Sequence, residues 1–128
     1  MSTASIATLT NKTLSSPTIN GTLNCGQAAV AQTTSNSTSV TINSSSGVIT
    51  MFGALNAGFT ATFTVNNTSC TANSIIIATV CQATLPLDAG VGFTVWAGNA
   101  TAGSFKIQVY NNLASNATRP AIINFLVC

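Results

Sequence analysis

The sequence is almost without charge. Only four of its 128 residues carry charged side chains, Lys12, Asp88, Lys106 and Arg119, and it contains no glutamate and no histidine. Soluble domains usually carry about 25% charged residues, against 3% here. One acidic side chain cannot supply the carboxylate pair of a glycoside hydrolase, and a Ser-His-Asp or Cys-His arrangement needs a histidine. The composition therefore predicts a protein that is not an enzyme.

Other features that the sequence lacks exclude two classes of partner, nucleic acids and membranes. The three basic residues are scattered along the chain, whereas a nucleic-acid-binding surface needs them clustered. The longest nearly apolar runs, Ile75–Cys81 and Ala121–Cys128, are far shorter than the about 20 residues of a membrane-spanning helix. The first residues lack the basic and apolar regions of a signal peptide. We therefore expect no nucleic acid, no membrane insertion, and synthesis in a cytosol.

The cysteines do not form a metal-binding pattern. Cys25, Cys70, Cys81 and Cys128 include no Cys-x-x-Cys pair, and no histidine is present to complete a ligand set. We expect no metal and no cofactor. Four cysteines allow three disulfide pairings, among which the sequence does not choose. Cys70 and Cys81 flank one expected strand and could meet across a turn, but free thiols are favoured for a cytosolic product.

Short uncharged polar residues take the place of the missing charges: 14 asparagines, 14 serines and 21 threonines. The N-x-[ST] pattern of glycosylation sites is frequent. Because asparagine, serine and threonine all concentrate in turns, we interpret these matches as turn chemistry rather than glycan sites. The matches begin at Asn11, Asn20, Asn36, Asn43, Asn66, Asn67, Asn99 and Asn116.

The chain divides into two regions of different composition. Residues 1–37 are polar with sparse apolar positions, and they predict an extended segment that leans on the rest of the domain or on other copies of the chain. Residues 38–128 contain short runs rich in Val, Ile, Thr and Phe between turn residues. They predict an antiparallel β-sandwich, with a jelly roll as the favoured form. The expected strands are Ser39–Asn43, Gly47–Phe52, Phe59–Asn66, Ser74–Cys81, Val91–Ala97, Ser104–Asn111 and Ala121–Cys128.

Alternation along three of these strands separates a core face from an outer face, because successive side chains of a strand point to opposite sides. The expected core residues are Phe59, Ala61, Phe63 and Val65, then Val91, Phe93 and Val95, then Phe105, Ile107 and Val109. The same alternation turns Trp96, Lys106, Gln108 and Tyr110 outward.

Two strands break this alternation. Ile75–Cys81 and Ala121–Val127 are apolar on both faces, whereas a strand of an antiparallel sandwich normally has one wet face. Leaving Ile122 and Leu126 exposed would forgo about 1.5–3 kcal/mol each. We therefore expect a homo-oligomer; the alternative is that residues 1–37 fold back over these strands. The interface candidates are Ile75, Ile77, Ile122 and Leu126, with Leu9, Leu14 and Ile19 from the first region.

The segment Leu9-Thr-Asn-Lys-Thr-Leu-Ser-Ser-Pro-Thr-Ile-Asn-Gly-Thr-Leu resembles the T-N-K-T-L-x-x-P-x-I-N-G segment of bacteriophage tail-fibre and related virion proteins. In those proteins the segment forms an extended trimeric stalk before a globular head. The second region resembles a head domain of phage and large-virus structural proteins. The matching pieces are Val40–Asn43, Gly47–Thr50, Phe59–Asn67, Ser74–Val80, Ala102–Asn111 and Ala121–Val127.

The resemblance implies a stalk-like or capping segment over residues 1–37 and a head domain over 38–128, assembled as a homotrimer. It implies a virion structural protein: a fibre head, spike or capsid-decorating protein. Its partners would be itself, other virion proteins and, in an attachment role, a host-surface glycan or receptor. The expected location is the virion. A carbohydrate-binding module or adhesin of non-viral origin is the alternative, and the row Thr60, Thr62 and Thr64 also prompts an ice-binding surface.

Ligand candidates come from aromatic residues on the outer face. Trp96 and Tyr110 have an apolar ring with a polar tip, a type favoured at contacts with partners and sugars, and Asn99 and Asn111 lie in adjacent turns. The competing interpretation places Trp96 in an intersubunit interface or over the sandwich edge. Asp88, the only acid, is interpreted as a turn residue, because one carboxylate is a poor calcium site.

Overall fold

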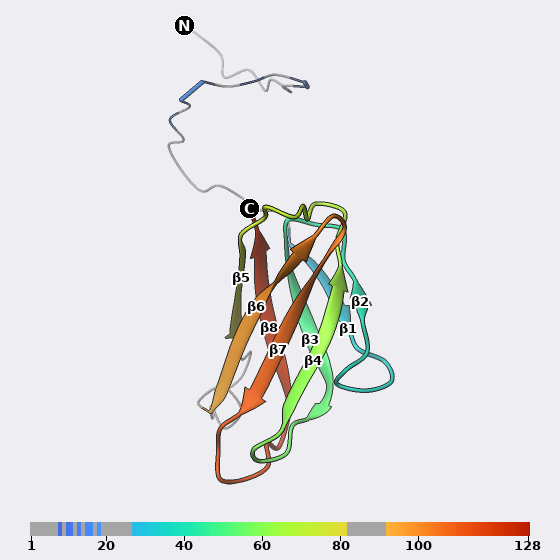
Figure 1. The fold of residues 1–128 in the computed structure, drawn as a ribbon, viewed down its shortest axis with the longest axis vertical. Coiled ribbons are helices and arrows are strands. Elements are labelled where there is room, and N and C mark those ends of the chain that lie inside the picture. Colours follow the sequence, from blue (N-terminus) through green and yellow to red (C-terminus); the bar gives the residue numbers. More distant parts are fainter. Residues whose placement is uncertain are drawn as a thin grey trace, which may run out of the picture.

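A computed structural model describes residues 27–81 and 92–128, together with positions 8, 10, 11, 13, 15, 16 and 18. These residues contain eight strands and no helix (Figure 1). The all-β prediction is confirmed, and each of the seven expected strands overlaps an observed one. The strands are β1 (Ala28–Ala31), β2 (Val40–Thr41), β3 (Ser46–Ala54), β4 (Thr60–Asn66), β5 (Ile76–Cys81), β6 (Phe93–Thr101), β7 (Ser104–Asn111) and β8 (Pro120–Val127).

The strands form two sheets of four. The first sheet has the order β1-β3-β8-β5, and the second has the order β2-β4-β7-β6 (Figure 1). Both sheets are mixed, because β1 pairs parallel to β3 and β2 pairs parallel to β4. The expectation of purely antiparallel pairing is therefore wrong at these two places. The two parallel pairs also separate this arrangement from the antiparallel Greek keys of a jelly roll.

The parallel pairs follow from the path of the chain. From β1 to β4 every connection crosses from one sheet to the other, so that strands two apart in the sequence become neighbours. Each crossing also reverses the chain, and two reversals restore its direction. Among the strands that the structure describes, only β6 and β7 are consecutive within one sheet. Strand spacing in a sequence does not distinguish such crossings from hairpins, which is why the pairing was mispredicted.

The core lies between the inner faces of the two sheets. The ring of Phe105 on β7 packs against the ring of Phe125 on β8, with centroids 5.4 Å apart and planes inclined at 55°. The alternation of β4 and β7 is confirmed, while Phe93 and Val95 on β6 are half-buried against the core. The buried core residues are Val40, Ile42, Ile49, Met51, Leu55, Ala61, Phe63, Val65, Cys70, Phe105, Ile107, Val109, Ala121, Ile123, Phe125 and Val127.

Two details differ from the sequence prediction. Phe59 is not a core residue: its N–H donates to the carbonyl of Asn56 in the turn before β4, and its side chain is 61% exposed. The sheets also begin before position 38, because β1 is hydrogen-bonded to β3. Gln32, which follows β1, is buried, and its amide donates to the carbonyl of Thr38 at 2.8 Å.

Asparagine side chains hold the connections between strands. Buried Asn67 donates to the carbonyl of Ser44 at 2.7 Å and accepts from the N–H of Ser69 at 2.8 Å. Asn116 accepts from the N–H of Ala57 at 2.9 Å, and Asn36 accepts from the N–H of Gly53 at 2.8 Å. These contacts confirm turn chemistry at three of the positions that match the glycosylation pattern.

Several sequence predictions fall outside the described residues: those on Leu9, Leu14, Ile19, Cys25, Asp88 and Val91. Of the remaining cysteines, Cys70 is buried, Cys81 is half-buried and Cys128 is exposed, and all three are free thiols. Within the described part of the chain, no helix has the length and apolar character required to cross a membrane.

Candidate functional site

The two sheets have outer faces of opposite character. On the first sheet, the strand register places Ile77 beside Leu126, Cys81 beside Ile122, and Val48 beside Asn124. Sheet alternation puts these side chains on the side away from the core. We call this surface the apolar face. Its members include Ala29, Ala31, Val48, Thr50, Ile75, Ile77, Thr79, Cys81, Ile122, Asn124, Leu126 and Cys128.

The apolar face is accessible in the described structure. Ile75 is 66% exposed and Ile77 is 53% exposed, while Ile122 and Leu126 are half-buried. No side chain of the face is charged. Both strands predicted to be apolar on two sides, β5 and β8, contribute to it. The four described interface candidates therefore lie together on one surface.

Asn124 carries the one amide side chain among the named residues of the apolar face. It lies on β8 opposite Val48 of β3 and Thr79 of β5, at the middle of the face. Its Oδ1 is the only buried side-chain oxygen or nitrogen without a hydrogen-bond partner in the part of the chain that the structure describes. An unsatisfied buried polar atom costs about 1–3 kcal/mol. The centre of the face therefore carries a locally unfavourable group.

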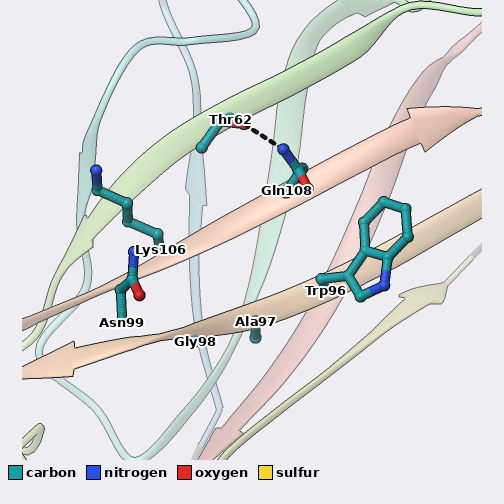
Figure 2. A pocket seen from close by; sticks show the side chains of 7 residues that line it. All are labelled: Thr62, Trp96, Ala97, Gly98, Asn99, Lys106 and Gln108. Atoms are coloured by element: carbon teal, nitrogen blue, oxygen red, sulfur yellow. Dashed lines mark hydrogen bonds between the residues drawn. The ribbon is translucent and has the colours of Figure 1, made fainter.

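The outer face of the second sheet is polar and contains a shallow hollow of about 260 Å³. Figure 2 shows Trp96 toward one end of the hollow and Lys106 with Asn99 toward the other. Trp96 is 50% exposed, so that its ring is available to a ligand. The lining residues are Thr62, Trp96, Ala97, Gly98, Asn99, Lys106 and Gln108.

The β6–β7 hairpin positions these side chains. Trp96 pairs with Gln108, and Gly98 pairs with Lys106. Gly98 has no side chain, so it leaves space between Trp96, two residues earlier on β6, and Lys106, its partner on β7. A Cβ built at Gly98 would meet nothing within 4 Å. Beyond Gly98 the register shifts, and Asn99 adopts a left-handed backbone with φ of 51°. Asparagine tolerates this conformation better than most residues do.

Hydrogen bonding leaves polar groups available in the hollow. The Gln108 amide donates to the Thr62 hydroxyl at 3.1 Å, and this bond leaves the Gln108 carbonyl oxygen to accept from a ligand (Figure 2). Lys106 is exposed and lies opposite Thr64 on its other side. No acidic side chain of the described residues neutralises it, since Asp88 is the only one in the chain. The hollow therefore combines an aromatic ring, amide groups and a positive charge.

The structure separates the four predicted ligand residues. Trp96 and Asn99 line the hollow, and Tyr110 lies one position further along the same outer face, beside Thr60 and Thr94. Asn111 does not reach a surface. It is fully buried, donates to the carbonyl of Leu55 at 2.8 Å, and accepts from the N–H of Leu113 at 2.9 Å. Its amide holds the loop after β7.

Sequence reasoning missed Thr62, Gly98, Lys106 and Gln108 as neighbours of Trp96. Alternation already turned Lys106 and Gln108 outward, and the Ala102-Gly103 turn marks a hairpin between their strand and that of Trp96. Reading the pairing register from this turn would have brought them together. Within the described residues, no three Cys, His, Asp or Glu side chains form a group that could hold a metal ion.

Comparisons of the chain with protein-family models, with curated proteins and with solved structures found no match.

Proposed function

We propose that this chain is a non-enzymatic structural protein of a virus particle that assembles with copies of itself into a homotrimer. The observation that carries the proposal is the apolar face, which leaves Ile75 and Ile77 more than half exposed on a single chain. Monomeric soluble proteins rarely expose large contiguous apolar patches, and such patches mark interaction sites.

A second copy is the occupant that best fits the chemistry of this face. The face has no charged side chain, so a charged partner would lose hydration without gaining an ion pair to a side chain. Another copy presents the same uncharged aliphatic surface and excludes water from both sides at once. Most soluble oligomers are symmetric assemblies of identical chains. The trimeric state and the virion location rest on the resemblance of residues 9–23 to tail-fibre stalk segments.

The test is the molar mass of the purified full-length chain, measured by light scattering coupled to size-exclusion chromatography. We expect three times the chain mass of 12.9 kDa. We also expect the mass to persist at high salt, because association through an uncharged face is not screened. A monomer over the micromolar range would refute the assembly. A trimer that dissociates on adding salt would refute the apolar face as its basis.

A carbohydrate-binding module or adhesin of non-viral origin is the second candidate, and the hollow at Trp96 favours it. An exposed aromatic ring beside amide side chains is a common platform for a partner with both apolar and polar surface. Such a module has no need to self-associate. A monomer that binds glycans through Trp96 would favour this candidate over the virion protein.

A further inference from the structure

We propose that the hollow at Trp96 binds a sugar that carries a carboxylate group. The inference extends the attachment role beyond an unspecified glycan or receptor by naming the chemical class of the ligand. It uses the second sheet, whereas the assembly uses the first. A failure to bind sugar would therefore not count against the trimer. A monomeric molar mass would likewise not count against sugar binding.

The size and shape of the hollow favour a small ring. Its volume of about 260 Å³ lies below the range of roughly 300–1,000 Å³ that is typical of sites for drug-sized ligands. One face of a sugar ring is lined by C–H groups and packs flat against an aromatic ring. Trp96, half exposed at one side of the hollow, supplies that ring. The sugar ring would then lie over Gly98, where no side chain fills the space.

The polar groups fit the rest of a sugar. The carbonyl oxygen of Gln108 accepts a hydrogen bond from a hydroxyl group, and the amide of Asn99 both donates and accepts. The place of Gln108 is fixed by the hairpin register and by its bond to Thr62. Side chains that are held by other contacts lose less freedom on binding.

The charge of the hollow selects an acidic sugar. Lys106 is one of three basic residues in the chain, and it lies directly across the strand pair from Gly98. A carboxylate on the ring accepts hydrogen bonds from its ammonium group while the ring covers Trp96. An acidic peptide would satisfy Lys106 but would not present the flat C–H surface that Trp96 packs against. We therefore favour the sugar.

The fluorescence of Trp96 can be used to measure ligand binding at the hollow, because Trp96 is the only tryptophan in the chain. The intrinsic fluorescence of the full-length protein is titrated with sialyllactose and with a hyaluronan tetrasaccharide, and with lactose and tetra-N-acetylchitotetraose as neutral counterparts. We expect saturable changes with both acidic sugars and affinities about fivefold lower for the neutral ones, the size of a solvent-exposed ion pair. Lys106→Gln should remove this difference.

A paired glycine experiment separates binding from folding. Gly98→Val fills the hollow and should lower affinity for every sugar by at least about tenfold, with an unchanged melting temperature, because its Cβ meets no neighbour and Gly98 has no positive φ. Gly53→Val, on β3 of the first sheet, is the matched control, since a Cβ there also meets nothing within 4 Å. It should bind as the wild type does.

Three results would overturn the proposal. They are the absence of a saturable response to either acidic sugar at millimolar concentration, equal affinities for acidic and neutral sugars, and sugar binding that Gly98→Val does not weaken. Tighter binding of an acidic peptide than of the acidic sugars would also overturn it, because the hollow would then recognise charge without the ring.

Discussion

The two outer faces of this protein differ more than the two sheets that carry them. Inward, both sheets present aliphatic and aromatic side chains to one core. Outward, the first sheet presents Ile75, Ile77 and Leu126, whereas the second presents threonines, Gln108 and Lys106. A sheet that faces water on one side needs only one apolar face. In the assembly that we propose, copies of the chain cover the first sheet, and the second sheet remains in water.

The inner faces of the two sheets should contribute equally to the stability of the core. Phe105 and Phe125 come from different sheets, are both buried and contact each other. We expect Phe105→Ala and Phe125→Ala to lower the free energy of unfolding by similar amounts, about 3–5 kcal/mol each. Denaturant unfolding measures both. A mild effect of Phe125→Ala beside a severe effect of Phe105→Ala would show that the first sheet packs differently from the second.

A smaller effect is expected at the centre of each outer face. Asn124→Val removes the unpaired buried oxygen of the apolar face. We expect the free energy of unfolding of this variant to be about 1–2 kcal/mol higher than that of the wild type. The matched change on the polar face is Gln108→Val. Because Gln108 is exposed and its side-chain amide donates to the exposed Thr62 hydroxyl, we expect a change within about 0.5 kcal/mol. Destabilisation by Asn124→Val would mean that the Asn124 amide has a partner in the assembly.

The alkylation rates of the thiols on the apolar face show whether other copies of the chain cover it. Cys128 is exposed and Cys81 is half-buried on the single chain. If copies cover this face, both should react with an alkylating reagent more slowly in the assembly than in a variant that cannot assemble, such as Ile77→Asp. Mass spectrometry of the labelled peptides measures the rates. Equal rates in the two proteins would place the interface elsewhere.

The smallest effect is expected from pH. Unfolding free energy depends on pH only through groups whose proton binding changes on unfolding. With no histidine, no glutamate and a single aspartate, few groups of this chain titrate between pH 5 and 8. We expect the melting temperature to move by no more than a few degrees in that window. A larger shift would reveal a titrating group that the composition does not account for.

Much of the fold could be predicted from local pattern. Alternation assigned the inner faces of β4 and β7, because pleating fixes which residues share a side. It failed at Phe59, where a turn ends the strand before that side chain can enter the core. The two parallel pairs were also missed. They depend on crossings between sheets, which are set by packing of the whole domain rather than by any one segment.

The candidate surfaces were predictable to a different extent. The apolar runs of β5 and β8 located the apolar face, because hydrophobicity on both sides of a strand can be read without knowing its neighbours. The hollow required the register of β6 against β7. Asn99 and Asn111 were indistinguishable in the sequence, since both are asparagines near turns. Backbone geometry sends one to the hollow and buries the other beside Leu55 and Leu113.

Self-assembly through the apolar face is tested most directly by the sedimentation of two variants. Ile77→Asp places a charge within the apolar face, and Phe59→Asp places the same charge at a similarly exposed apolar residue outside it. An unpaired charge is costly to bury, so Ile77→Asp should sediment as a folded monomer while Phe59→Asp keeps the wild-type trimer. Two variants that both remain trimeric would contradict the claim that copies of the chain cover this face.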